Sequence, residues 1–441
     1  MDVRELRDAA QLIWGAALAA ASPAACIRNA LQCADGRLTV SGREIPIRGR
    51  IIVIGAGKAA AVMAQAAEEI LGSCLTAGLV VTKYGHALPL RRIRIIEAGH
   101  PIPDPNGVDA VDQTRRLVGD LSENDLVLCL ISGGASALWP APAAGITLED
   151  KQQVTQLLLR AGATIRELNA VRKHLSAMKG GQLARWAAPA RVISLIMSDV
   201  IGDPLDFIAS GPTAPDSSSF SDALGIVRKY GIRAPAAVLD RLQAGAGGRI
   251  PDTPKPGDPV FDHVANHIIA NNRLLADAAE RKARDLKFNT LTLATQVEGE
   301  ARYLGGLFAA IAREAAQSGN PVRPPACILA AGETTVTVRG EGLGGRNQEM
   351  ALAWAVAMAA HAGAAPSCFA SVASDGTDGP TNAAGGLVDP MTSARAAAAG
   401  LDPIRSLEAN DSYRLLKTTG DLIVTGPTQT NLMDLQILLV A

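Results

Sequence analysis

A glycine-rich turn that carries a lysine is the first feature able to do chemistry. Gly55 and Gly57 precede Lys58 in a G-x-G-x-x-A pattern that follows an apolar run at residues 51–54. Glycines let the backbone approach an anion, and the N-terminus of a following helix offers free N–H groups to it. Because a cation in the first helical turn is unfavourable by itself, Lys58 indicates a phosphate that neutralises it. A tight strand–helix turn without a ligand is the alternative interpretation.

A second turn of similar composition follows the apolar run at residues 126–131. Ser132 and Ser136 flank the pair Gly133 and Gly134, and the backbone of such a pair can form an anion-binding concavity. An ordinary loop is the alternative. Both turns would nevertheless lie at the same edge of a parallel sheet, where such sheets bind their ligands. We therefore expect the two turns to hold a cofactor.

An acidic residue lies at the same predicted edge. Asp199 comes two residues after the apolar run at residues 192–197. A carboxylate in this place could act as a general base or bind magnesium through water. The alternative is an ordinary helix N-cap, a position that Asp favours.

A basic stretch covers residues 169–181. It contains Arg172, Lys173, His174 and Lys179. A solvated helix face is the default interpretation of such charges. His174 taken alone is more often structural than catalytic.

The second half of the chain repeats the pattern of glycine loops with charged residues. Arg346 and Asn347 would open a helix directly after the glycine-rich segment 340–345, and Glu333 lies in a hairpin-like segment before it. The planar fork of arginine suits phosphate or carboxylate oxygens, although a surface arginine beside a flexible loop is the alternative. Asp375 lies in an acidic, glycine-rich segment, 374–381, which is either a Mg²⁺ site or a plain turn.

The composition excludes several classes of protein. A net charge of −1 and only four Trp, four Tyr and six Phe in 441 residues argue against a nucleic-acid binder. Six scattered cysteines without a C-x-x-C pair predict neither a disulfide framework nor a zinc site, and favour a reducing cytoplasm. No signal peptide and no membrane span are predicted. With six histidines and no G-x-S-x-G motif, the remaining chemistry is that of phosphoryl transfer, which needs positioning and charge neutralisation.

Short apolar runs that alternate with Ala- and Leu-rich helical stretches must position these residues. Continuous apolar strands between helices indicate an α/β fold with a parallel sheet covered on both faces. A Pro- and Gly-rich segment at residues 244–260 reads as a linker. We therefore predict a Rossmann-like three-layer domain over residues 1–243 and a smaller α/β domain over residues 261–441.

These segments together resemble the ATP-dependent glycerate 2-kinase family. The C-terminal part of that family is called the MOFRL domain. Many of its members carry an older label as hydroxypyruvate reductases. The matching segments run in the family's order along nearly the whole chain: residues 54–59 (IGAGKA), 97–101 (EAGHP), 132–136 (SGGAS), 167–173 (ELNAVRK), 198–200 (SDV), 210–213 (SGPT), 332–334 (GET), 344–349 (GGRNQE), 374–379 (SDGTDG) and 425–428 (TGPT). The last loop departs from the family pattern, because Gln429 replaces a glycine and Met433 an asparagine.

The resemblance implies transfer of the γ-phosphoryl group of ATP to the 2-hydroxyl of D-glycerate, with Mg²⁺. It also implies two α/β domains with a cleft between them, faced by Lys58 and Arg346. In this hypothesis Lys58 neutralises the transferred group, Arg346 grips the substrate carboxylate or the γ-phosphate, and Asp199 orients or deprotonates the hydroxyl. Asp375 or Glu333 would organise the metal, and the turn at residues 132–136 would bind an anionic group.

Two other functions remain open from the residues alone. An NAD(P)H-dependent hydroxypyruvate reductase agrees with the G-x-G-x-x-A pattern, but the second strand ends in Thr82 and Lys83 and lacks the acid that would hold a ribose. A non-catalytic nucleotide sensor is the other. The expected partner is a small-molecule substrate, with no nucleic acid and no membrane, and the oligomeric state is open, a homodimer included.

Overall fold

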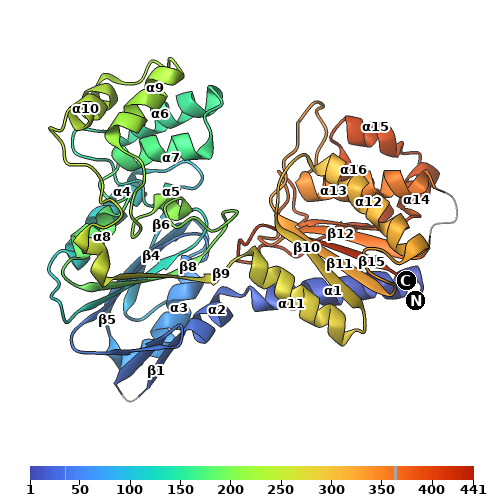
Figure 1. Cartoon of the computed structure of the whole chain (residues 1–441), viewed down its shortest axis with the longest axis horizontal. Helices are drawn as coiled ribbons and strands as arrows, with labels where there is room; N and C mark the ends of the chain where they lie inside the picture. Colours follow the sequence, from blue (N-terminus) through green and yellow to red (C-terminus); the bar gives the residue numbers. More distant parts are fainter. Residues whose placement is uncertain (35, 362–364) are drawn as a thin grey trace. The chain divides into compact units, whose positions relative to one another are not determined.

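The computed structural model describes residues 1–34, 36–361 and 365–441, and the chain forms two compact α/β units (Figure 1). The central unit comprises Pro23–Ile269, and the terminal unit combines Met1–Ser22 with Ala270–Ala441. This division differs from the predicted boundaries at both ends. The first 22 residues pack in the terminal unit, and the Pro-rich segment 244–260 belongs to the central unit instead of linking two domains.

A six-stranded sheet forms the core of the central unit and has the order β6-β5-β4-β7-β8-β9. Its strands are β4 (Ile51–Ala56), β5 (Leu75–Lys83), β6 (Ile93–Ala98), β7 (Leu126–Ile131), β8 (Arg191–Met197) and β9 (Val264–Ala270). The pairs β6–β5, β5–β4, β4–β7 and β7–β8 are parallel, which confirms the predicted Rossmann-like sheet. The segments that follow β4, β7 and β8 therefore leave the sheet at one edge.

Helices cover this sheet and also form a separate cluster. The helices are α2 (Pro23–Ala30), α3 (Ala60–Leu71), α4 (Pro105–Val118), α5 (Ala135–Leu138), α6 (Leu148–Arg160), α7 (Ile165–His174), α8 (Gln182–Ala187), α9 (Phe220–Lys229) and α10 (Ala236–Ala246). A small antiparallel sheet contains the strands β1 (Leu31–Ala34), β2 (Arg37–Val40) and β3 (Arg43–Pro46). Helices α6, α7, α9 and α10 lie together (Figure 1) around their own apolar core. Thr147, Thr164 and Ser219 each begin one of these helices with a capping box, which satisfies its first N–H groups.

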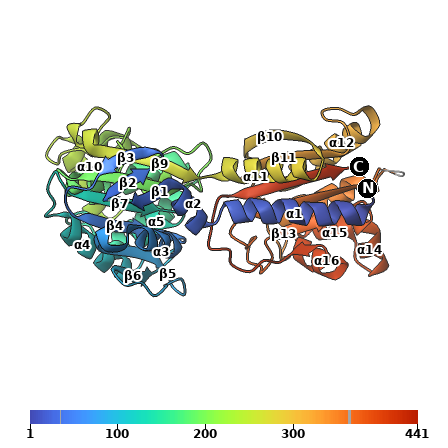
Figure 2. The same cartoon turned by 90° about the horizontal axis from the view of Figure 1, so that it is seen from below.

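The terminal unit has a sheet of order β10-β11-β15-β12-β13-β14, in which only β10 and β11 run parallel. Its strands are β10 (Asn289–Val297), β11 (Ala326–Gly332), β12 (Ser367–Ala373), β13 (Gly385–Val388), β14 (Leu422–Ile423) and β15 (Asp434–Val440). Its helices are α1 (Val3–Ala20), α11 (Asn272–Asp285), α12 (Ala301–Ser318), α13 (Arg346–Ala359), α14 (Thr392–Ala398), α15 (Pro403–Glu408) and α16 (Ser412–Thr419). Helices α12 and α13 cover one face and α1 with α11 the other, which makes three layers (Figures 1 and 2).

The N-terminal helix α1 is part of this core. A capping box between Asp2 and Glu5 begins it, and it buries Leu6, Ile13 and Trp14 on one side. Among the residues that the structure describes, no single helix is long and apolar enough to cross a membrane. Helices α1 and α2 together have the length and composition, but they are bent by 52° at the break between them.

Helix α13, which begins at Arg346, is held in place by close packing against α12. A methyl group built on Gly305 of α12 would lie 2.4 Å from the carbonyl oxygen of Met350 and 2.9 Å from the Cβ of Ala353. The neighbouring Gly306 has open space around it. The two helices can therefore approach this closely only because residue 305 has no side chain.

We expect Gly305→Ala to lower the free energy of unfolding by about 1–3 kcal/mol, because the added methyl must push the helices apart. Gly306→Ala is the matched control and should raise stability by up to about 1 kcal/mol through helix propensity. Chemical denaturation of both variants measures the difference. Equal effects of the two substitutions would contradict the packing argument.

Candidate functional site

The two predicted glycine turns of the central unit are bound to each other. The backbone N–H of Lys58 donates to the carbonyl oxygen of Gly133 at 2.8 Å, and the N–H of Ala59 donates to the Oγ of Ser132 at 3.1 Å. Gly57 has a φ of +140°, and a methyl group there would lie 2.1 Å from that Oγ. The buried Ser132 hydroxyl is therefore occupied in joining the turns, and Lys58 is placed beside Gly133.

The first glycine of the pattern has a packing role. Gly55 is buried within β4, and a methyl group on it would lie 2.4 Å from the carbonyl oxygen of Leu130 in β7. Its lack of a side chain lets two neighbouring strands pack closely. Gly55 thus supports the turn that carries Lys58.

The side chain of Lys58 lies beside two other groups at this edge. A methyl group built on Gly134 would lie 3.4 Å from the Cγ of Lys58 and 2.9 Å from the His100 ring. Burial raises the pKa of Asp199 above its ordinary value, while the charge of Lys58 opposes that shift. Asp199 does not cap a helix, since the chain continues from β8 into a turn. The structure thus brings Lys58 and Asp199 into electrostatic contact.

A pocket of about 530 Å³ opens next to this group, within the central unit. Three cationic side chains line it, namely Lys151 of α6, Arg172 of α7 and Lys179. His100, Gly134 and Ser136 lie on its wall. The Nζ of Lys179 donates to the Ser136 Oγ at 2.5 Å and to the Ser136 carbonyl oxygen at 2.6 Å.

The predicted solvated helix face is wrong, because the basic stretch turns inward. Lys173 is 2% exposed and forms ion pairs of 3.1 Å with both Asp206 and Asp216, so its role is structural. The Nε2 of the buried His174 lies 2.9 Å from Asp252. Arg172 and Lys179 of the same stretch line the pocket instead.

Sequence reasoning missed Lys151 altogether and left Arg172 and Lys179 on the surface. Burial, with the charges of Arg172 and Arg241, lowers the pKa of Lys151 to about 7. Burial, with the charges of Lys151 and Arg172, also lowers the pKa of Lys179 well below its ordinary value. The available signals were the family-like segment 167–173, which contains Arg172, and the pair of glycines that follows Lys179.

In the terminal unit Arg346 is held by two carboxylates. Its Nε and Nη2 donate to Asp434 at 2.6 and 3.0 Å, and its Nη1 forms a 3.0 Å ion pair with Glu333. Burial lowers the pKa of Arg346, but the hydrogen bonds and charge of Asp434 outweigh burial and raise it above its ordinary value. Glu333, predicted as a metal ligand, pairs with Arg346 in this structure.

Asn347, the next residue of α13 after Arg346, is buried. It has no exposed surface, its Oδ1 accepts a 2.6 Å hydrogen bond from Ser371, and its Nδ2 donates to Asp378 at 3.3 Å. Asp378 in turn accepts from the backbone N–H groups of Asn347 and Gln348 at the start of α13. Asn347 is expected from the sequence to help bind the cofactor; in this structure its side chain bonds Ser371 and Asp378, a residue that the sequence analysis did not single out.

Burial raises the pKa of Asp378 to about 6, although its hydrogen bonds oppose the shift. Asp375 accepts from the N–H and Oγ1 of Thr377 at 3.0 and 3.1 Å, and its charge contributes to a raised pKa of the buried Asp434. Carboxylates thus gather around Arg346. Within the described part of the chain, no group of three or more His, Cys, Asp or Glu side chains is arranged to hold a metal ion by itself.

The loop that departs from the family pattern keeps an unusual backbone. Gln429 has a φ of +61° and Met433 a φ of +65°, so both adopt the left-handed conformation that favours glycine or asparagine. Both positions thus carry a side chain where the backbone conformation favours glycine or asparagine. Met433 accepts a backbone hydrogen bond from the N–H of Ser374 at 2.9 Å, which joins this loop to the segment of Asp375.

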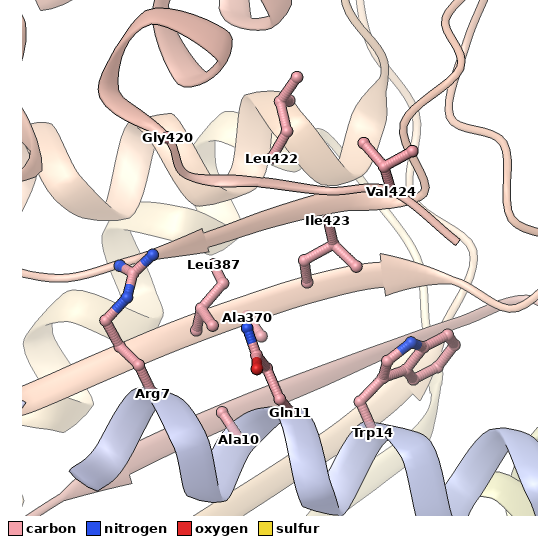
Figure 3. A pocket seen from close by; sticks show the side chains of 10 residues that line it. All are labelled: Arg7, Ala10, Gln11, Trp14, Ala370, Leu387, Gly420, Leu422, Ile423 and Val424. Carbon is pink, nitrogen blue, oxygen red and sulfur yellow. The ribbon is translucent and has the colours of Figure 1, made fainter. Parts of the chain in front are cut away.

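A second cavity of about 280 Å³ lies in the terminal unit, between α1 and the strands β13 and β14 (Figure 3). Arg7, Gln11 and Trp14 of α1 point toward it. Arg7 is occupied by ion pairs of 2.8 Å with Asp389 and 2.9 Å with Asp421. Because none of the predicted site residues lines this cavity, it is separate from the candidate site.

Comparison with known proteins covers both units. Residues 9–243 match a family described as a domain of unknown function, DUF4147, and residues 326–434 match the MOFRL family. The chain is 45% identical to the D-glycerate 2-kinase of Thermotoga maritima over 88% of this chain and 90% of that protein. It is 41% identical to the glycerate 2-kinase of Pyrococcus horikoshii over 100% of this chain and 98% of the relative. The crystal structure of the glycerate kinase from Thermotoga maritima is similar with a TM-score of 0.89 and 41% identity, covering 99% of this chain and 100% of that one.

The environment of His100 generates a prediction about pH. Burial, with the charges of Lys58 and Lys83, lowers the pKa of His100 from 6.5 to about 4. Between these values the unfolded chain binds a proton that the folded chain does not, so stability falls as the pH drops from about 6.5 to about 4. His100→Gln should remove this component and gain about 1–2 kcal/mol relative to the wild type across the interval, allowing for partial solvent screening.

Denaturant unfolding of both proteins at a series of pH values measures this difference. The two stability curves should converge above pH 7 and separate on acidification. Curves that run parallel from pH 7 to pH 4 would show that His100 is not held neutral by its surroundings.

Proposed function

The chain belongs to the glycerate 2-kinase family, in which DUF4147 and MOFRL regions are combined, and from this premise we propose that it transfers the γ-phosphoryl group of ATP to the 2-hydroxyl of D-glycerate. The products are 2-phosphoglycerate and ADP. The observation that carries the proposal is the end-to-end match to a glycerate 2-kinase at 41% identity. The lysine, arginine and carboxylates at the glycine turns support it, because phosphoryl transfer is catalysed by positioning and charge stabilisation.

Lys58 is the residue proposed to neutralise the transferred phosphoryl group. Its backbone is fixed by the hydrogen bond to Gly133, which keeps the side chain at the carboxyl edge of the sheet. A cation that is already in place needs no reorganisation when negative charge develops in the transition state. The turn with Gly133, Gly134 and Ser136 lies beside Lys58 and is proposed to bind an anionic group of the substrates.

Asp199 is the proposed base for the 2-hydroxyl. Burial raises the pKa of its carboxyl group, while the positive charge of Lys58 makes this rise smaller. A pKa nearer to the working pH makes a carboxylate a better proton acceptor. In this role Asp199 accepts the hydroxyl proton as the oxygen attacks the γ-phosphorus atom.

Arg346 is proposed to bind the substrate carboxylate or the γ-phosphate. Among the described residues, Asp434 and Glu333 occupy three of its N–H groups, so two of the five in a guanidinium are left for an anion. The bidentate pair with Asp434 fixes the plane of the guanidinium, and a fixed plane favours bidentate recognition of oxyanions.

Asp375 and Glu333 are the carboxylates proposed to hold Mg²⁺. Magnesium is commonly bound through one or two carboxylates together with substrate phosphates and water, so these side chains fit the ion only when a nucleotide is present. Bound Mg²⁺ would neutralise charge on the phosphates. Glu333 would then be shared between the ion and Arg346.

An assay of ADP release tests the proposed function. We expect release with D-glycerate and Mg²⁺-ATP, and phosphorus NMR should place the phosphate on the 2-hydroxyl. A panel of other short hydroxy acids defines the substrate range. Oxidation of NAD(P)H by hydroxypyruvate without any ADP release would instead support the reductase hypothesis.

Replacement of Lys58 tests its catalytic role. Lys58→Met should lower kcat by at least about 100-fold, or roughly 2.7 kcal/mol of transition-state stabilisation. Lys83→Met is the matched control, because Lys83 also acts on the His100 pKa but is the last residue of the neighbouring strand β5. The control should keep kcat within about threefold of the wild type. A Lys58→Met enzyme within about tenfold of the wild type would reject the role.

A further inference from the structure

The pocket of the central unit is lined by positive charge without compensating acids. Lys151 is 8% exposed and Lys179 is 3% exposed. Among the described residues that line the pocket, none is an Asp or Glu. Burying cations without acidic partners is unfavourable, because neutral hydrogen bonds replace only part of the lost hydration. A ligand with several negative charges would replace it.

Two of the three cationic side chains are hydrogen-bonded to neighbouring segments. Lys151 donates to the carbonyl oxygen of Pro140, and Lys179 donates to Ser136. In the part of the chain that the structure describes, the guanidinium of the half-buried Arg172 has no hydrogen bond or ion pair. The cations therefore come from three separate segments and remain available to an incoming anion.

The rim of the same pocket is apolar. Ile102 is 64% exposed and Leu159 is 54% exposed, and both line the pocket. Gln152 and Thr155 of α6 lie on the lining as well and supply polar groups. A cationic floor with an apolar rim suits a ligand that has a highly charged end and a flat, less polar end.

The size and position of the pocket agree with such a ligand. A volume of about 530 Å³ lies in the range of pockets that hold nucleotide-sized molecules, whereas a three-carbon acid would leave most of it empty. Gly134 and His100 on the pocket wall are the groups that lie beside Lys58. A phosphate at this wall would therefore be next to Lys58.

We propose that this pocket binds the nucleoside triphosphate donor, with its phosphates on Lys151, Arg172 and Lys179 and its base against Ile102 and Leu159. The proposal rests on the proposed kinase function and assigns the donor to the central unit. The terminal phosphate is then directed toward Lys58, and the hydroxy acid binds elsewhere.

Arg172→Gln tests the phosphate end. Calorimetry on the full-length chain should show at least a tenfold loss of ATP affinity, with the KM for D-glycerate within about threefold of the wild type. Inorganic tripolyphosphate, which has no base, should compete with ATP in the wild type and lose most of this ability in the variant. Arg160→Gln is the matched control, since Arg160 is exposed on α6 and does not line the pocket.

Leu159→Ser tests the base end. It should weaken the binding of ATP and of adenosine several-fold and leave tripolyphosphate binding unchanged. Ile165→Ser is its control, because Ile165 is 56% exposed and lies outside the pocket. Since Leu159 is itself exposed, this variant keeps the fold even if Arg172→Gln does not, and thermal melting verifies both proteins.

The outcomes separate the two proposals. If Arg172→Gln raises the KM for glycerate and leaves ATP binding unchanged, the pocket belongs to the acceptor and the inference is overturned, while the kinase function stands. If Leu159→Ser leaves adenosine and ATP binding unchanged, the assignment of the base is overturned. ATP binding that depends on Arg172 and Leu159 in a chain that phosphorylates no hydroxy acid would support the inference and reject the function.

Discussion

Two hydrogen bonds tie the turn after β4 to the turn after β7, and the candidate site depends on them. The N–H groups of Lys58 and Ala59 donate into the second turn, which accepts through Gly133 and Ser132. This contact requires a glycine at position 57, because the Ser132 hydroxyl occupies the place of a side chain. The parallel sheet supplies the rest of the constraint, since it brings both turns to one edge. The backbone of Lys58 is consequently fixed at this edge, beside Asp199.

The two units differ in how their cationic side chains are paired with acidic ones. In the central unit the described residues that line the pocket include cationic side chains but no acid, and burial disfavours the charged forms of Lys151 and Lys179. In the terminal unit Arg346 is surrounded by carboxylates, two of which pair with it directly. Phosphoryl transfer uses both arrangements, because the phosphates need cations and a divalent metal needs carboxylates.

Several residues near the site serve to hold others in place. Asn347 fixes Asp378, which accepts from the start of α13, and the close packing at Gly305 holds that helix against α12. Lys173 performs a similar task in the central unit through Asp206 and Asp216. Asn347 and Lys173 lie in segments that resemble binding motifs, yet their side chains contact other residues of the protein.

The sequence by itself determined the α/β class, the parallel sheet and the glycine turns with Lys58 and Arg346, because these depend on local patterns of apolar runs and glycines. It did not determine that α1 packs in the terminal unit or that Asn347 is buried. It also did not predict that Lys151, Arg172 and Lys179 meet in one pocket, or that Arg346 pairs with a residue 88 positions away. Only the tertiary structure decided these points, because whether a charge faces solvent, a pocket or a partner depends on segments that are distant along the chain.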